Sequence, residues 1–487
     1  MSAAAATSSG LFPIVDLPAL ACRRWSTLIS FLIADVVALS LSGVAAVLVR
    51  YLLNGHFTPA DYLPFAPGLV LFVLIFSGLG LYPGIGVNPV AEFRRIVVGT
   101  SVSYLLIIAA MFAAKESSFY SRGIFLSAAP LSVALLLISR SLVRCWCSGK
   151  LWWGIPTVIF GAGETGQWIL NTLRAQPQLG FRPIALLDPY IDQVNLQADM
   201  SSKIFVGDFS LAPVFAQMHQ SCYAIVTLPG LSSRQLTDLV CGYSSGFSQV
   251  LSIPDLFGFS SVWISARAMG GVLGLEVSQM FLHRIPRLIK RALDIAFGVA
   301  LAVLLLPLLV LIYIAIRTTS PGPMLYGQKR VGLEHGTFTA WKFRSMVSNA
   351  DAVLEFHLER DPELRAQWDR DHKLKQDPRV TRVGKFLRRT SLDELPQIWN
   401  VIQGDMSLVG PRPIVTAEIS KYGKSFDLYC KVRPGITGMW QISGRNDTSY
   451  EHRVQFDEYY VRYWSIWLDA YILFRTIKTV LLTEGAY

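Results

Sequence analysis

The sequence of 487 residues lacks the features that mark several common classes of protein. Only 16% of its residues are charged and 52% are hydrophobic, a balance that is too apolar for an ordinary soluble protein. Its six cysteines include no Cys-x-x-Cys pair, and its seven histidines show no metal-ligand spacing, so neither a zinc site nor a disulfide framework is expected. The first 20 residues also lack the cationic segment that begins a cleavable signal peptide.

Negative charge is the scarcer sign in this chain. The 34 acidic residues are outnumbered by 44 lysines and arginines, which gives a formal net charge of +10. Such an excess favours anionic partners, namely lipid headgroups, nucleotides or both. An equally open explanation is that the cytoplasmic faces of membrane proteins are commonly basic.

Apolar residues gather in four stretches near the start of the chain. These stretches cover residues 28–49, 64–81, 96–114 and 124–142. Each is close to the ~20 residues that a helix needs to cross a bilayer. Cations precede the first stretch at Arg23 and Arg24 and follow the fourth at Arg144 and Lys150, so the positive-inside rule places both ends in the cytoplasm. We predict a four-helix transmembrane domain over residues 1–150.

The pattern then changes to one typical of a nucleotide-binding fold. Residues 157–160 read as a buried strand, which Gly161-Ala-Gly-Glu-Thr-Gly166 and a helical run follow. A second strand ends at Asp188, about where a dinucleotide fold places an acid. We predict a Rossmann-like α/β domain over residues 151–275. Such glycine turns also serve strand–helix packing alone, so we favour a regulatory or structural role over cofactor binding.

The chain contains no Tyr-x-x-x-Lys. Short-chain reductases and nucleotide-sugar dehydratases use that pair as their base, so a membrane nucleotide-sugar dehydratase is a weak alternative for this chain. A non-catalytic scaffold that recruits glycosyltransferases is an alternative of a different class. It could describe the first 270 residues even if the rest of the chain is catalytic.

A fifth apolar run covers residues 295–316 and contains Pro307. If this run crossed the membrane, everything after Arg317 would lie outside the cytoplasm, where nucleotide sugars are absent. Proline removes a backbone hydrogen bond and clashes with the preceding turn, so a bend at this position is physically reasonable. We predict a re-entrant helix over residues 293–317, broken at Pro307, that enters and leaves on one face.

Two adjacent carboxylates, Asp393 and Glu394, follow a run of cations that includes Arg388 and Arg389, and Gly-Pro-Arg412-Pro comes shortly after them. A carboxylate pair among arginines is typical of a site that handles phosphate and a divalent metal. The alternative is a helix start, because Ser391-x-x-Glu394 also has the spacing of a capping box.

The segment from residue 284 to the end resembles bacterial polyprenyl-phosphate glycosyl-1-phosphate transferases, the monotopic phosphoglycosyl transferase superfamily. Six blocks in order carry the resemblance: Lys290-Arg-x-x-Asp294, Lys342-Phe-Arg-Ser-Met346, Ser391-Leu-Asp-Glu-Leu-Pro396, Val409-Gly-Pro-Arg-Pro413, Arg433-Pro-Gly-Ile-Thr-Gly438 and Gly444-Arg-Asn446. Residues 276–487 are therefore predicted to be a mixed α/β catalytic domain. The whole chain is most similar to the branch that transfers galactose 1-phosphate. One departure is Leu306-Pro307, where small members often have Ser-Pro.

The resemblance implies transfer of a hexose 1-phosphate from a UDP-sugar to undecaprenyl phosphate, with release of UMP. We hypothesise that Asp393 attacks the β-phosphorus to form an aspartyl-phosphosugar intermediate, and that Glu394 binds Mg²⁺. Lys342 and Arg412 are candidate phosphate ligands. Arg445 is a candidate nucleotide contact, and Asp457 is a candidate metal or sugar ligand.

The resemblance also implies a place and partners for the chain. We expect the bacterial inner membrane, with several spans and an active site that faces the cytoplasm. The expected partners are the UDP-sugar donor, undecaprenyl phosphate and membrane lipid, with no nucleic acid and a possible homodimer. The reaction would begin O-antigen, capsule or exopolysaccharide synthesis, and a UDP-glucose-specific transferase of the same family remains an alternative.

Overall fold

The computed structural model describes most of the chain, in two compact units, Met1–Phe259 and Ser260–Tyr487. The described residues are 23–54, 58–115, 120–150, 152–189, 204–218, 223–228, 247, 249–253, 264–269, 272–277, 284–319, 321–347, 349–371, 374, 377–443 and 449–481. The predicted nucleotide contact Arg445 lies outside them.

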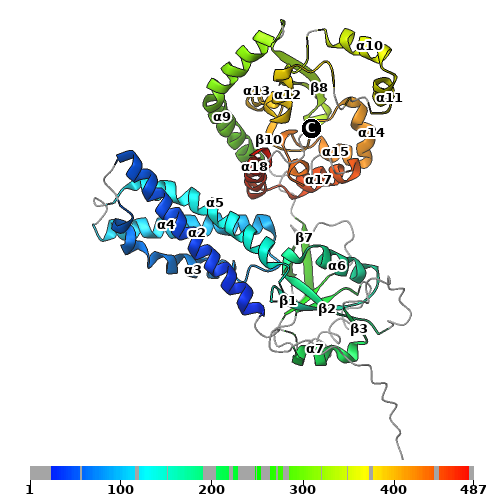
Figure 1. Cartoon of the computed structure of the whole chain (residues 1–487). Coiled ribbons are helices and arrows are strands. Elements are labelled where there is room, and N and C mark those ends of the chain that lie inside the picture. Colours follow the sequence, from blue (N-terminus) through cyan, green and yellow to red (C-terminus); the bar gives the residue numbers. More distant parts are fainter. Residues whose placement is uncertain are drawn as a thin grey trace, which may run out of the picture. The chain divides into compact units, whose positions relative to one another are not determined.

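Helices form a bundle in the first unit (Figure 1). They are α2 (Arg23–Asn54), α3 (Gly68–Gly78) after the 3₁₀ turn η1 (Pro59–Phe65), α4 (Pro89–Ala113) and α5 (Arg122–Cys147). Each predicted apolar stretch overlaps one candidate membrane span: α2, α4, α5, and residues 60–78, which combine most of η1 with α3. The start of α4 shows how the local sequence determines where a helix begins. Asn88 accepts a hydrogen bond from the Val90 amide, and Pro89 occupies the first helical position.

Four charged side chains neutralise one another inside this bundle. Arg140 is 1% exposed and donates to both carboxylate oxygens of Asp35, at 2.9 and 2.6 Å. Its third bond reaches Glu92 at 2.9 Å, and Arg144 also pairs with Glu92, at 2.7 Å. Charges buried among apolar helices persist only when they are paired and hydrogen-bonded in this way. The cluster therefore ties α2, α4 and α5 together.

A parallel sheet forms the rest of the described first unit. Its strands are β1 (Ile155–Phe160), β2 (Phe181–Leu187), β3 (Phe205–Gly207), β4 (Tyr223–Val226) and β5 (Gln249–Ser252), beside the helices α6 (Glu164–Ala175) and α7 (Ala212–Met218). The strand order is β3-β2-β1-β4-β5, with every described pairing parallel. This order matches the first five strands of an open, doubly wound α/β sheet.

The predicted glycine turn lies between β1 and α6. Gly161 has a φ of +104°, which favours glycine, and a Cβ on Gly166 would lie 1.9 Å from the Gly161 carbonyl oxygen. Gly161 is therefore required by its backbone conformation, and Gly166 by the close approach of α6 to the turn. The acid predicted at the end of the second strand, Asp188, accepts a hydrogen bond of 2.7 Å from the Ala162 amide. It thus holds the turn itself.

In the second unit, α9 (Arg284–Thr319) is one helix of 36 residues that contains Pro307. The predicted break does not end the helix, and Figure 1 shows α9 curving along one side of its unit. Its composition and length also suit a membrane span, so re-entry on one face stays a prediction. Near its start, Asp294 accepts hydrogen bonds from Ser407 and Leu408, at 2.8 and 3.1 Å. This acid therefore fixes the helix against its unit.

The second unit also contains the following described elements, among which β8 and β9 form an antiparallel hairpin. They are β6 (Ile264–Met269), β7 (Val272–Val277), the hairpin strands β8 (Leu325–Val331) and β9 (Thr337–Phe343), α10 (Ala350–Arg360), α11 (Pro362–Asp371), α12 (Arg382–Arg389), η9 (Leu392–Glu394), α13 (Gln397–Gln403), β10 (Ser407–Val409), α14 (Ile419–Tyr422), α15 (Phe426–Tyr429), β11 (Gly435–Thr437), α16 (Met439–Ile442), α17 (Tyr450–Tyr463) and α18 (Ile466–Leu481). In the hairpin, Tyr326 pairs with Lys342 and Leu325 pairs with Phe343. Because side chains alternate along a strand, these two pairs lie on opposite faces.

Candidate active site

A cavity of about 920 Å³ lies against the face of the hairpin that carries Tyr326 and Lys342. Both predicted catalytic carboxylates, Asp393 and Glu394, line it. Its cationic lining residues are Arg330, Lys342, Arg344, Arg379, Arg388, Arg412 and Arg453. Seven cations against two acids make this hollow a site for an anionic ligand with several charges.

The two carboxylates lie on the 3₁₀ turn η9. Ser391, just before this turn, has a φ of 57°, a left-handed conformation that is costly for a residue other than glycine. Its side chain makes no capping hydrogen bond, so the capping-box alternative is wrong. The next helix, α13, begins after Pro396. The strained backbone therefore serves to aim Asp393 and Glu394 into the cavity.

The positive charge of Lys342 acts on both carboxylates. Its ammonium lies 2.6 Å from a carboxylate oxygen of Glu394. Burial raises the pKa of the Asp393 carboxyl to about 6, and the charge of Glu394 adds to that rise. The charges of Lys342 and Arg388 oppose it. Asp393 is thus a weakly hydrated carboxylate held near cations, the state that suits a nucleophile toward phosphorus.

One wall beside Asp393 is built by α12. Arg388 donates a hydrogen bond of 2.8 Å from Nε to the hydroxyl of Ser345. This approach depends on Gly384, because a Cβ there would lie 1.9 Å from the Ser345 carbonyl oxygen. Thr381 caps the helix through the Gly384 amide, at 2.9 Å. Sequence reasoning placed Arg388 in a cation run but gave it no contact with the site.

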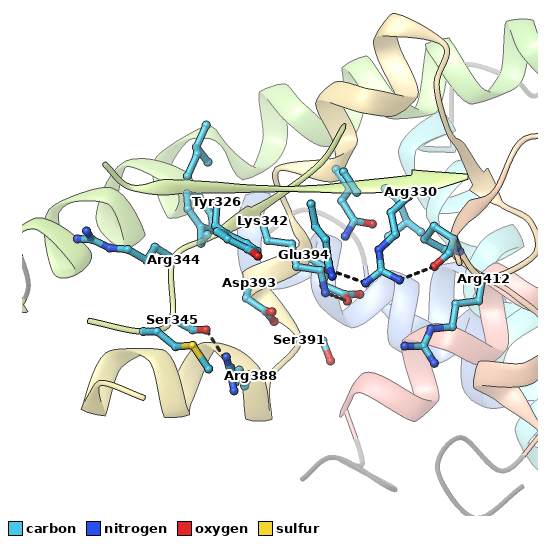
Figure 2. A pocket seen from close by; sticks show the side chains of 18 of the residues that line it. Tyr326, Arg330, Lys342, Arg344, Ser345, Arg388, Ser391, Asp393, Glu394 and Arg412 are labelled. Atoms are coloured by element: carbon cyan, nitrogen blue, oxygen red, sulfur yellow. Dashed lines mark hydrogen bonds and ion pairs between the residues drawn. The ribbon is translucent and has the colours of Figure 1, made fainter. Parts of the chain in front are cut away.

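The opposite wall holds Arg412 with two further arginines. The guanidinium of Arg412 lies 5.3 Å from the ring centroid of Trp440, and that of Arg453 lies 5.0 Å from it. Burial and the charge of Arg412 lower the pKa of both Arg330 and Arg453. An anion bound here would relieve that repulsion. Figure 2 shows Asp393 and Glu394 between the wall with Arg388 and the wall with Arg330 and Arg412.

Three members of this wall were not predicted as site residues. Arg330, Trp440 and Arg453 come from β8, α16 and α17, and only the fold brings them together. The sequence of β8 holds a partial signal for Arg330. Tyr326, Gln328 and Arg330 occupy every second position, so they lie on the one face of the strand that lines the cavity. Trp440 closely follows the block that ends at Gly438 in the family resemblance, whereas Arg453 belongs to none of the blocks.

Asp457, predicted as a metal or sugar ligand, is not among the residues that line the cavity. It is 2% exposed and accepts a hydrogen bond of 2.7 Å from the Tyr422 hydroxyl. Burial raises the pKa of its carboxyl to about 7, while the hydrogen bond from Tyr422 opposes the rise. In this position Asp457 joins α17 to α14 through Tyr422.

The predicted Mg²⁺ can be judged from the donor set. Among the described residues, no group of three or more His, Cys, Asp or Glu could hold a metal ion. Mg²⁺ is commonly bound by one or two carboxylates together with substrate phosphates. Glu394, the predicted ligand, lines a cavity suited to phosphate and fits that pattern with one carboxylate.

Comparisons with known proteins agree with this site. The family model described as bacterial sugar transferase matches residues 285–483, and a model described as CoA-binding domain matches residues 78–254. The UDP-galactose-lipid carrier transferase of Erwinia amylovora is 39% identical over 371 residues, which cover 75% of this chain and 76% of that protein. The chain therefore belongs to the bacterial sugar transferase family, and it is a sugar-phosphate transferase enzyme.

Two further relatives cover similar shares of the chain. The undecaprenyl-phosphate galactose phosphotransferase of Salmonella typhimurium is 35% identical, over 76% of this chain and 77% of its own length. The UDP-glucose:undecaprenyl-phosphate glucose-1-phosphate transferase of Escherichia coli is 33% identical, over 82% of this chain and 84% of its own. A crystal structure of a Rex-family repressor matches 25% of this chain and 57% of the repressor chain, at 19% sequence identity and a TM-score of 0.19. This likeness is too slight to bear on function.

Proposed function

We propose that this enzyme transfers a hexose 1-phosphate, galactose 1-phosphate in the first instance, from a UDP-sugar to undecaprenyl phosphate. The observation that carries the proposal is the position of Asp393, between two arginine-lined walls and close to Lys342. A diphosphate placed across the cavity would have cations at both ends and a carboxylate near its centre. The named substrates of the relatives from Erwinia amylovora and Salmonella typhimurium favour galactose, and that of the Escherichia coli relative keeps glucose as the alternative.

The first step is a displacement at the β-phosphorus of the donor. A carboxylate oxygen of Asp393 forms a bond to that phosphorus, and the bond to the oxygen bridging the two phosphates breaks. UMP leaves with the bridging oxygen and its electron pair. When bound, Mg²⁺ supplies charge neutralisation to the diphosphate, and Glu394 would hold it. Lys342 and the arginines stabilise negative charge on the leaving phosphate.

The second step returns Asp393 to its starting state. A phosphate oxygen of the acceptor attacks the phosphorus of the aspartyl-phosphosugar, and the bond to the Asp393 oxygen breaks. The product is a lipid-linked diphosphate sugar, and no oxidant or further reactant is needed. Attack by a dianionic phosphate on a charged phosphoryl group requires neutralisation, which the wall of Arg330, Arg412 and Arg453 supplies.

The proposed setting is the bacterial inner membrane, with the active site on the cytoplasmic side where UDP-sugars are made. Five helical segments among the described residues are long and apolar enough to cross a membrane, and together with the relatives they support a bacterial membrane protein. A role at the start of O-antigen, capsule or exopolysaccharide synthesis follows from the same chemistry. A homodimer remains part of this proposal.

Mass spectrometry tests the mechanism directly. Full-length protein mixed with UDP-galactose and Mg²⁺, without acceptor, should gain the mass of a hexose phosphate on the peptide that contains Asp393. Asp393→Asn should carry no adduct, whereas Asp427→Asn, at an acid that is 83% exposed, should still form it. Turnover without any adduct, with UMP released only in a ternary complex, would falsify the covalent route. Parallel assays with UDP-glucose decide the sugar.

A further inference from the structure

A second hollow, of about 700 Å³, lies on the other face of the β8–β9 hairpin. Trp341 and Phe343 of β9 line it together with Pro396 and Trp399 beyond the catalytic turn and Leu309 of α9. Trp399 is 56% exposed, although it is a large aromatic side chain. We call this hollow the aromatic groove. It is framed by the start of α13, directly after the turn that carries the carboxylates, and by the long apolar helix α9.

The chemistry of the groove is opposite to that of the basic cavity. Eight of its twelve lining residues are apolar, and none of the described residues that line it is cationic. Its one charged side chain, Asp405, is an acid, which accepts a hydrogen bond of 3.2 Å from Asn400. A groove of this kind cannot hold a phosphate and repels anionic lipid headgroups. It suits an uncharged hydrocarbon chain.

The groove and the basic cavity are adjacent. Leu325 and Phe343, the pair at the open end of the hairpin, line both of them. Pro396, in the groove, is two residues from Glu394, in the cavity. An amphiphile with an anionic head and an apolar chain therefore finds its two complementary surfaces on either side of one hairpin end.

We propose that the aromatic groove binds the first isoprene units of the acceptor, while its phosphate reaches Asp393 around the end of the hairpin. This inference rests on the proposed function, since it assumes a prenyl phosphate acceptor. The groove has the size of an ordinary small-molecule pocket, so it takes only part of a long chain and leaves the rest to the bilayer. Leu309 of α9 places the exit of the groove against the membrane helix.

Acceptor kinetics test this assignment. Trp399→Ala removes an aromatic wall of the groove but no side chain of the basic cavity. For undecaprenyl phosphate, kcat/KM should fall about tenfold, or about 1.4 kcal/mol, chiefly through KM. A short, water-soluble prenyl phosphate that barely enters the groove should lose much less. Phe386→Ala is the matched control, because Phe386 is 59% exposed in the same unit and lines neither hollow.

The outcomes separate the groove from the reaction itself. Equal losses for long and short acceptors, or an equal loss in Phe386→Ala, overturn the groove assignment while the transferase proposal stands. If the unaltered protein transfers to no prenyl phosphate at all, the proposed function fails instead. Adduct formation from UDP-galactose alone should be unchanged in Trp399→Ala, because the donor does not use the groove.

A second measurement does not depend on turnover. The photoreactive amino acid p-benzoylphenylalanine in place of Trp399 should crosslink undecaprenyl phosphate in vesicles of phosphatidylglycerol and phosphatidylethanolamine. The same replacement at Phe386 should not. Crosslinks to phosphatidylglycerol in equal yield, unaffected by added prenyl phosphate, would show a site for bulk lipid and refute a groove for the acceptor.

Discussion

The Lys342 ammonium lies 2.6 Å from a Glu394 carboxylate oxygen, and its charge also lowers the pKa of Asp393. One cation thus acts on both members of the carboxylate pair. Lys342→Met should therefore move the acidic limb of the pH–rate profile to higher pH, because the opposing influence on Asp393 is lost. Initial rates of UMP release from pH 5 to 9 measure this shift. An unmoved limb with a lower plateau would mean that Lys342 acts on the substrate alone.

Protonation of Asp393 predicts a pH dependence of the unaltered enzyme. Attack on phosphorus needs the carboxylate, whose pKa is raised to about 6. The rate of UMP release should fall about tenfold for each pH unit below 6 and level off above it. A plateau that continues down to pH 4.5 would show that chemistry at Asp393 does not limit the rate.

The same pKa shift predicts that protein stability falls as the pH rises, whereas the reaction rate increases. Between pH 3.8 and about pH 6, the Asp393 carboxyl keeps its proton in the folded protein but has lost it in the unfolded chain. The contribution of this carboxyl to the free energy of unfolding therefore falls as the pH rises through that window. At pH 7.5, Asp393→Asn should therefore raise the apparent melting temperature by about 2–4 °C while it abolishes transfer. Thermal scans at pH 5 and 7.5 check it, since the gain should be smaller at pH 5.

Arg412 should be sensitive even to a conservative change. Its guanidinium lies over Trp440 and belongs to a wall of three arginines, a geometry that lysine cannot reproduce. Arg412→Lys and Arg412→Ala should both lower kcat/KM for the donor by about 10- to 100-fold. Arg389→Ala is the control, because Arg389 neighbours Arg388 on α12 but does not line the cavity. Unchanged kcat/KM in Arg412→Lys would mean that Arg412 contributes only its positive charge.

The buried ionic cluster in the bundle predicts a structural loss. Arg140→Met leaves Asp35 and Glu92 without the guanidinium that bonds both of them. Breaking a buried pair in this way costs about 3–5 kcal/mol, so the first unit should melt earlier or be degraded in cells. Arg122→Met, at an exposed residue of the same helix, should melt like the unaltered protein. Equal melting of both variants would contradict the predicted role of the cluster.

The parts of the fold that could be predicted are those with local signals. Helix length and hydropathy located α2, α4 and α5, and the glycine turn before α6 located the start of a parallel sheet. The pair Asp393 and Glu394 was a candidate because it lies among cations, in a block that resembles a known family.

The parts that could not be predicted depend on tertiary structure. Trp440 and Arg453 join Arg330 from more than 100 positions along the chain, so no window of sequence reveals the wall that they form. Asp457 looked like a ligand beside two tyrosines, but the fold turns it inward to Tyr422. Pro307 predicted a broken helix, whereas α9 accommodates it within a continuous one.

The alternation of the β8–β9 hairpin has a consequence for how this enzyme can evolve. Lys342 and its neighbours Trp341 and Phe343 serve two hollows of opposite polarity from consecutive positions. A slip of one residue in the strand pairing would exchange the two faces of the hairpin. Trp341 would then face the basic cavity, and Lys342 would face the aromatic groove. The turn at Leu333–His335, with left-handed Glu334 and His335, sets that pairing. Insertions and deletions of a single residue there should be rarer among natural variants than substitutions of any one lining side chain.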